Sequence, residues 1–171
     1  MIYVFRVILD WEKDDVFRDL HLEETASLED LHVAIVNAFV LDGQQMASFY
    51  RSNDDWDQGE EFSLMPLEDG KNSVKAMSDW SLKEVIEQDR ERFIYVYDFL
   101  DMWTFFVELM AIREPEIGEI YPMLGEAVGK LPPSAPDKEW DAPNPGMGDD
   151  DIFDGDDSFS DFGMDGDDDY F

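Results

Sequence analysis

The chain has 171 residues and carries 43 acidic residues against only 12 basic ones, which gives a formal net charge of −31. Such a charge repels the phosphates of nucleic acids and of anionic lipids, so we expect neither direct nucleic-acid binding nor attachment to a membrane. The absence of cysteine excludes disulfides and thiolate chemistry and, with no apolar run of about 18 residues, indicates a soluble cytoplasmic protein.

Three segments in the first third of the chain are rich in strand-forming residues. Residues 2–9 hold Ile, Val, Tyr and Phe with one charged interruption, Arg6, and predict a strand covered on both faces. After a charged turn, residues 16–22 alternate partly and predict a second strand that is antiparallel to the first. Residues 46–51 predict a third strand.

A helix is predicted between the second and third of these strands. Ser27 is a candidate N-cap with Asp30 three residues on, and such a cap contributes about 1 kcal/mol. Gly43 is placed to end the helix, because a left-handed conformation carries little steric cost for glycine. The apolar positions that recur at helical spacing and predict one buried stripe are Leu28, Leu31, Ile35 and Phe39.

The second half of the chain predicts another helix and a hairpin. The run Ser-Leu-Lys-Glu at residues 81–84 is a full capping box, so we expect a helix from there toward Arg90. Residues 92–99 and 102–112 are dense in aromatic and β-branched residues and predict a tight hairpin. Residues 121–128 predict a short helix. The fold class is therefore α+β, with a mainly antiparallel sheet and two principal helices.

A change of composition near residue 137 predicts two regions. Residues 1–136 retain a net charge of −18 together with enough apolar residues for a core, so we expect one folded domain. Residues 137–171 hold 14 acidic residues and one basic residue, and we expect a disordered tail because like charges repel. Aromatic residues are interspersed among the aspartates of this tail, and four of them are candidates for docking to a partner: Phe153, Phe159, Phe162 and Phe171. A tail that only keeps the protein in solution is the alternative.

Three stretches of the predicted domain together resemble one known family. They are Phe17-Arg18, Leu28 through Leu31-His32, and the hairpin block Tyr95-Val96-Tyr97-Asp98-Phe99-Leu100-Asp101-Met102-Trp103. This combination resembles the plasmid pRiA4b ORF-3-like family, also labelled transposon passenger proteins of the TnpR type, over about residues 1–136. The resemblance implies an α+β fold with a mainly antiparallel sheet and an association with mobile elements. It implies no activity, because none is securely attached to the family.

The hairpin block departs from the family pattern at its turn. The family usually has Tyr-Asp-Phe-Gly-Asp, whereas Leu100 stands here in place of the glycine. Because leucine disfavours a positive φ, we expect the hairpin to turn differently or to bear strain. A histidine and a cysteine of the family pattern are replaced by Gln45 and Leu131, so any metal site built from them would be lost.

Asp98 and Asp101 are the first candidates for a binding site. They lie three residues apart across the predicted turn, where both carboxylates could face one cation or one substrate proton. An aspartate near a turn also accepts hydrogen bonds from backbone amides, and this structural role is the leading interpretation. Partner binding and catalysis are the alternatives.

Tyr97, Trp103 and Arg18 complete the candidate binding residues. Alternate aromatic residues of the hairpin are expected in the core, with Trp103 the exception because an indole at a hairpin shoulder is often only partly buried. Arg18, on the second predicted strand of an acidic domain, is expected to pair with a carboxylate.

The motif content decides between classes of function. No phosphate-binding loop, dinucleotide fingerprint or His-Glu-x-x-His motif occurs, so no catalytic residue, metal or cofactor is assigned. We expect a monomeric, non-enzymatic interaction module whose acidic and aromatic tail docks a basic partner protein. Two alternatives stay open. One is a divalent-metal enzyme using Asp98 and Asp101, and the other is a nucleic-acid mimic that occupies a basic DNA-binding surface.

Overall fold

The computed structural model describes residues 1–67 and 74–137, which all belong to one unit, Met1–Asp137. Apart from Asp137, the predicted tail lies outside the described residues, as do its candidate docking residues Phe153, Phe159, Phe162 and Phe171. Among the described residues, no helix is long and apolar enough to cross a bilayer.

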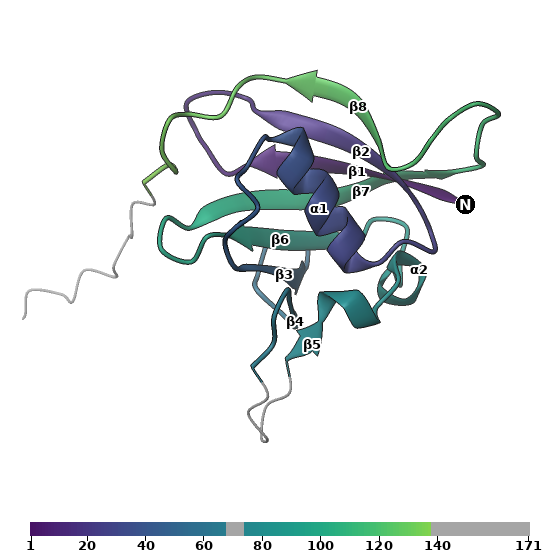
Figure 1. The fold of residues 1–171 in the computed structure, drawn as a ribbon, viewed down its shortest axis with the longest axis horizontal. Helices are drawn as coiled ribbons and strands as arrows, with labels where there is room; N and C mark the ends of the chain where they lie inside the picture. Colours follow the sequence, from purple (N-terminus) through teal and green to yellow (C-terminus); the bar gives the residue numbers. More distant parts are fainter. Residues whose placement is uncertain (68–73, 138–171) are drawn as a thin grey trace, which may run out of the picture. The chain divides into compact units, whose positions relative to one another are not determined.

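One eight-stranded sheet forms the framework (Figure 1). The strand order is β5-β4-β3-β6-β7-β1-β2-β8, and all neighbours pair antiparallel except β4 and β5, which are parallel. The expected α+β fold with a mainly antiparallel sheet is confirmed. The strands are β1 (Ile2–Leu9), β2 (Phe17–Glu23), β3 (Ala47–Ser52), β4 (Glu61–Ser63), β5 (Lys75–Ala76), β6 (Arg92–Tyr97), β7 (Trp103–Arg113) and β8 (Met123–Val128).

A single long helix, α1 (Leu28–Ala38), lies across one face of this sheet (Figure 1). It begins at the predicted N-cap, where a capping box forms: the Ser27 hydroxyl accepts a hydrogen bond from the Asp30 amide at 3.1 Å, and the Asp30 carboxylate accepts one from the Ser27 amide at 2.8 Å. The core lies between the helix and the sheet, and its largest fully buried side chains include Phe5, Tyr95 and Phe105. The cap and the buried stripe predicted for this helix are confirmed.

The second helix is shorter than the sequence predicts. After a 3₁₀ turn (Met77–Asp79), α2 (Leu82–Val85) begins at the predicted capping box but ends after one turn instead of near Arg90. Arg51 of β3 contacts this early end, because its Nη1 donates to the Val85 carbonyl at 2.9 Å and to the Glu91 carboxylate at 2.8 Å. The Arg51 side chain thus bonds to the Val85 carbonyl, which in a longer helix would accept an intrahelical hydrogen bond.

Residues 121–128 contribute an edge strand, so the helix predicted there is wrong. β8 pairs antiparallel with β2. The two strands approach each other closely at Gly125, where a Cβ atom on this residue would lie 2.8 Å from the Nε2 of His21. Pairing satisfies the outer backbone groups of β2, and this outweighs a weak local preference for helix.

Candidate functional site

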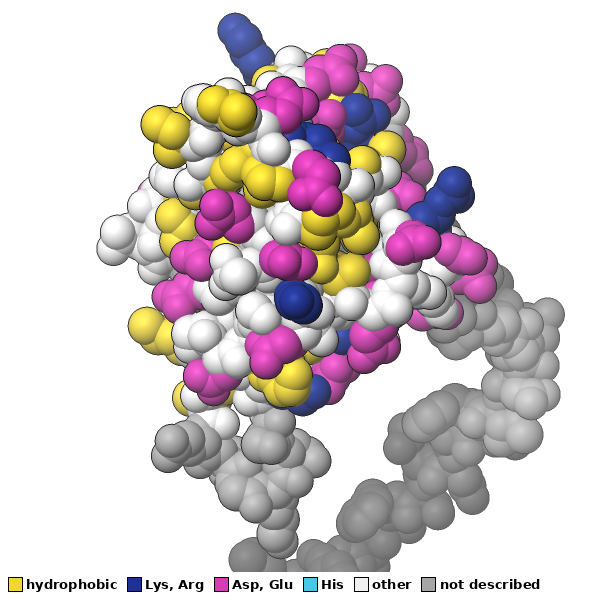
Figure 2. All heavy atoms as spheres, turned by 90° about the vertical axis from the view of Figure 1, so that its right-hand side faces the viewer, with side chains coloured by type: hydrophobic (Ala, Val, Ile, Leu, Met, Phe, Trp, Pro, Cys, Tyr) yellow, Lys and Arg dark blue, Asp and Glu magenta, His cyan; other side chains and the backbone are white. Residues whose placement is uncertain are grey.

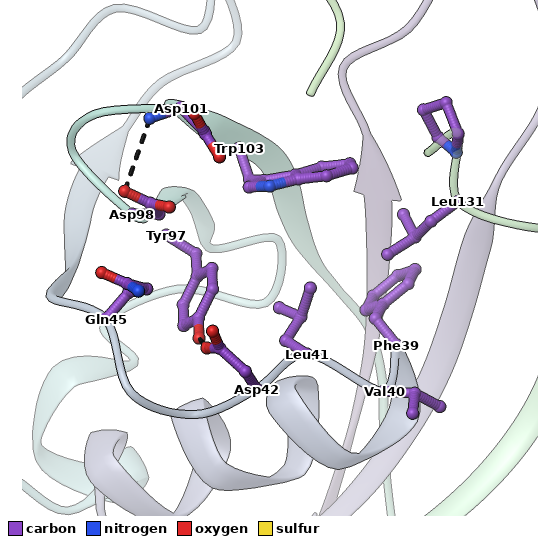
Figure 3. A pocket seen from close by; sticks show the side chains of 11 residues that line it. Phe39, Val40, Leu41, Asp42, Gln45, Tyr97, Asp98, Asp101, Trp103 and Leu131 are labelled. Carbon is purple, nitrogen blue, oxygen red and sulfur yellow. Dashed lines mark hydrogen bonds between the residues drawn. The ribbon is translucent and has the colours of Figure 1, made fainter. Parts of the chain in front are cut away.

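A hollow of about 360 Å³ lies where three segments that are distant in the sequence meet (Figure 3). The first segment, within residues 39–45, is the end of α1 and part of the loop to β3. The second, within residues 97–103, is the β6–β7 turn, and the third is Leu131 with Pro132 after β8. The structure therefore brings together Tyr97, Asp98, Asp101 and Trp103, four of the five binding residues predicted in the folded domain.

Tyr97 and Asp42 join the first two segments. The Tyr97 hydroxyl donates a hydrogen bond to the Asp42 carboxylate and accepts one from the Gly43 amide at 2.8 Å. The Tyr97 hydroxyl and the Gln44 amide, which donates to the same carboxylate at 3.0 Å, lower the pKa of Asp42. Burial, and then the hydrogen bond to Asp42, raise the pKa of Tyr97. At neutral pH this corner of the hollow therefore presents a carboxylate held by a neutral phenol.

Asp98 shapes the β6–β7 turn. Its Oδ1 accepts hydrogen bonds from the amides of Leu100 at 3.0 Å and Asp101 at 3.4 Å, which is the structural role expected for an aspartate in this turn. Within the described residues, the Asp98 Oδ2 and the Asp101 carboxylate have no hydrogen-bond partner, and neither residue has an ion pair. The turn thus leaves acceptor oxygens available at the hollow.

Apart from the aspartates, the Gln45 amide and Tyr97, the residues that line the hollow are apolar. Trp103 is half-buried, as predicted, and its indole extends from the turn toward Leu131 (Figure 3). Phe39 and Tyr97 are almost fully buried and belong to the core. Asp42 stands beside Tyr97, across from Asp98 (Figure 3). The hollow therefore combines an aromatic wall with carboxylates on two sides.

Two residues that line the hollow and one neighbour in the β6–β7 turn are non-glycine residues with a positive φ. They are Val40 at 55°, Asp98 at 60° and Met102 at 57°. Leu100, which replaces the family's glycine, is not among them; within the β6–β7 turn the positive φ values fall on Asp98 and Met102. The helix α1 ends differently from the prediction, because Val40, rather than Gly43, is the first residue after it with a positive φ. A β-branched residue in this conformation is a genuine outlier, and such strain collects at binding sites.

Arg18, the fifth predicted residue, lies outside the hollow and is not paired with a carboxylate among the described residues. Its guanidinium donates to the carbonyls of Val128 at 2.8 Å and Gly129 at 2.9 Å, and to the carbonyl of Ala38 at 3.4 Å. It also lies 5.0 Å from the ring centre of Phe39, which lines the hollow. Arg18 therefore ties the end of α1 to the end of β8 and holds two walls of the hollow in place.

Comparison with known proteins places the fold in a family. The family model described as plasmid pRiA4b ORF-3-like protein matches residues 1–139. The chain belongs to this family. Among solved structures, the crystal structure of a protein of unknown function from Methanosarcina mazei Go1 is similar, with a TM-score of 0.62 over 74% of this chain and 68% of that chain. At 18% sequence identity this likeness shows the fold alone.

No curated protein matches this pRiA4b ORF-3-like chain. Among the described residues, no group of three or more His, Asp or Glu side chains is arranged to hold a metal ion. The lining residues that the sequence did not indicate as candidates are chiefly Asp42 and Phe39, the latter predicted only as part of the buried stripe of a helix. Gln45 and Leu131, which stand where the family pattern has a histidine and a cysteine, both line the hollow. Nothing local in the sequence signals that their segments meet the β6–β7 turn.

Proposed function

We propose that this pRiA4b ORF-3-like protein is a non-enzymatic interaction module that binds a basic partner protein. The observation that carries the proposal is the hollow itself. Asp42, Asp98 and Asp101 line it, no lysine or arginine does, and within the described residues none of the three has an ionic partner. Because a concave site focuses the field of its charges, an unpaired acidic hollow favours a cationic group.

The charge of the whole domain supports the same class of partner. Residues 1–136 carry a net charge of −18. Figure 2 shows one end of the described unit, where Asp and Glu side chains spread over the surface and Lys and Arg side chains are fewer. Such a field speeds the approach of a positively charged protein. In this proposal the aspartates of residues 137–171 extend the field, and Phe153, Phe159, Phe162 and Phe171 dock to the same partner.

Exposed apolar side chains beside the hollow favour a protein over a simple ion. Val40, which lines it, is 88% exposed, and Leu100 in the adjacent turn is 92% exposed. Phe99 of the same turn is also exposed. Apolar side chains next to charged groups are typical of protein interfaces, where they exclude water from the contact.

Affinity enrichment with the full-length protein, followed by binding measurements with the purified partner, tests this function. We expect a basic partner whose affinity falls as salt rises, and falls several-fold further in the double variant Asp98→Asn, Asp101→Asn. Asp55→Asn is the matched control, because this exposed carboxylate lies on the loop after β3 and does not line the hollow. A partner that binds independently of salt and equally to all three proteins would contradict the proposal.

The role of the tail is tested separately in the full chain. Replacing Phe153, Phe159, Phe162 and Phe171 by alanine preserves the charge of the protein. If these residues dock to the partner, the affinity falls while its salt dependence is unchanged. An unchanged affinity would leave the tail with a purely electrostatic contribution. The metal-dependent enzyme, the nucleic-acid mimic, the monomeric state, the cytoplasmic location and the mobile-element association remain predictions.

A further inference from the structure

Arginine side chains of this protein repeatedly bind an aromatic ring and a carboxylate together. The guanidinium carbon of Arg6 lies 4.2 Å from the ring centre of Phe17, while its Nε donates to Asp19 at 2.8 Å. Arg51 and Arg113 show the same combination of a ring and an acidic partner. The combination is favourable because the guanidinium is planar and weakly hydrated, so it stacks on a ring while its edge donates to a carboxylate.

The contacts of one arginine of the protein itself closely match the chemistry of the hollow. Arg92 lies 4.9 Å from the ring centre of Trp56, and it donates to Glu108 at 3.2 Å. The hollow likewise has an indole, Trp103, beside carboxylates, but no arginine among the residues that the structure describes lines it. The cation is the one part of the arrangement that the described residues do not supply there.

We propose that the hollow receives an arginine side chain of the basic partner, stacked on Trp103 and hydrogen-bonded to Asp98 and Asp101 on one side and Asp42 on the other. This inference rests on the proposed function and names the group that the partner presents. The carboxylates stand on two sides of the hollow (Figure 3), and a guanidinium has five donors directed outward in one plane. The volume of about 360 Å³ holds this group with its methylene stem.

Lysine is the competing ligand. Within the protein, the Lys75 ammonium lies 4.2 Å from the ring centre of Trp80 and pairs with Glu60 at 2.7 Å. An ammonium is more strongly hydrated. It is also a compact point charge, without the planar set of donors by which a guanidinium bonds to carboxylates on two sides. We therefore expect the hollow to bind arginine more tightly than lysine.

Titration of the full-length protein with three small probes tests the proposal. The probes are N-acetylarginine amide, N-acetyllysine amide and N-acetylcitrulline amide, the last a neutral analogue of arginine. The readout is the NMR signal of the Trp103 indole N–H, assigned with the variant Trp103→Phe. We expect a saturable shift with the arginine probe, a several-fold weaker affinity for the lysine probe, and no saturable shift with citrulline.

Variants locate the binding. In the full-length Asp98→Asn, Asp101→Asn protein, we expect the affinity for the arginine probe to fall about tenfold or more, because two acceptors of the guanidinium lose their negative charge. Asparagine still accepts the turn amides and tolerates the positive φ of Asp98, so the turn is retained. Asp55→Asn should bind the probe as the wild type does. An unmoved Trp103 signal, equal shifts with citrulline or lysine, or equal shifts at every indole would overturn the proposal.

Binding of octaarginine and octalysine distinguishes a failure of the arginine site from a failure of the basic-partner function. If both peptides bind the protein with equal affinity, and the double variant binds both of them several-fold more weakly, the basic-partner function holds and the arginine site fails. If neither peptide binds, the basic-partner function fails, whatever the small probes show at Trp103.

Discussion

His32 is 5% exposed in the core, and its Nδ1 lies 2.7 Å from the hydroxyl of Tyr95. Burial raises the pKa of Tyr95, so the phenol stays protonated at neutral pH, and it shares one hydrogen bond with the imidazole. Burial also lowers the pKa of His32 below its ordinary value, because a charged imidazole is poorly solvated there. The neutral ring is thus part of the folded state.

This pair predicts a pH dependence of stability. With the pKa of His32 lowered by folding, the unfolded chain binds more protons below about pH 6.5. The free energy of unfolding should therefore fall as the pH drops below that value, by at most about 1.4 kcal/mol per pH unit. Urea unfolding at pH 7.5, 6.5 and 5.5 measures the change. The variant His32→Gln should have a smaller slope between pH 6.5 and 5.5, and an identical slope would contradict the assignment.

At the scale of elements, one buried carboxylate joins three of them. Glu91 is 2% exposed, and it accepts hydrogen bonds from Arg51 of β3 at 2.8 Å and from the amide of Glu87 at 3.1 Å. Arg51 in turn contacts the last carbonyl of α2. The end of α2, strand β3 and the start of β6 are therefore held by one network.

Glu91→Ala should be strongly destabilising, because it leaves Arg51 partly buried without its closest acidic partner. We expect a loss of about 3–5 kcal/mol in the free energy of unfolding, the usual cost of removing one member of a buried ion pair. Glu87→Ala is the control, since that side chain is 72% exposed and lies 3.8 Å from Arg51. Its cost should stay within about 1 kcal/mol. Equal losses in urea unfolding for the two variants would show that burial of Glu91 contributes little.

At the scale of the whole molecule, the formal net charge of −31 is a destabilising term. Raising the sodium chloride concentration from 0.01 to 0.15 M shortens the screening length from about 30 to about 8 Å. We expect the free energy of unfolding to rise on the order of 1 kcal/mol, because repulsion among carboxylates is screened. Choline chloride at equal ionic strength should give the same gain. A loss of stability with salt would mean that ion pairs such as Arg6 with Asp19 outweigh the repulsion.

Much of the fold is predictable because its signals are local. The capping box at Ser27 and the dense aromatic arms on either side of the β6–β7 turn act within a few residues. Their elements appear where the sequence predicts them. Four hollow residues were also predictable, since Tyr97, Asp98, Asp101 and Trp103 lie within one seven-residue stretch of the chain.

The failures occur where a distant partner decides the outcome. Residues 121–128 resemble a short helix by themselves, but the free edge of β2 makes them a strand. α2 ends early where Arg51 contacts the Val85 carbonyl, and Arg18 bonds to backbone carbonyls where a carboxylate was expected. In the first two cases tertiary hydrogen bonds outweigh a local helix preference of a few tenths of a kcal/mol per residue.

The sequence by itself determined the fold class, the family, the acidic character and the hairpin residues that line the hollow. Only the tertiary structure decided that the hollow exists, because Asp42 and Leu131 come from segments far from the hairpin in the chain. Packing of the end of α1 against the end of β8, with Arg18 between them, brings these segments to the β6–β7 turn. Local patterns encode single elements, whereas a site built from three segments depends on contacts that only the assembled sheet provides.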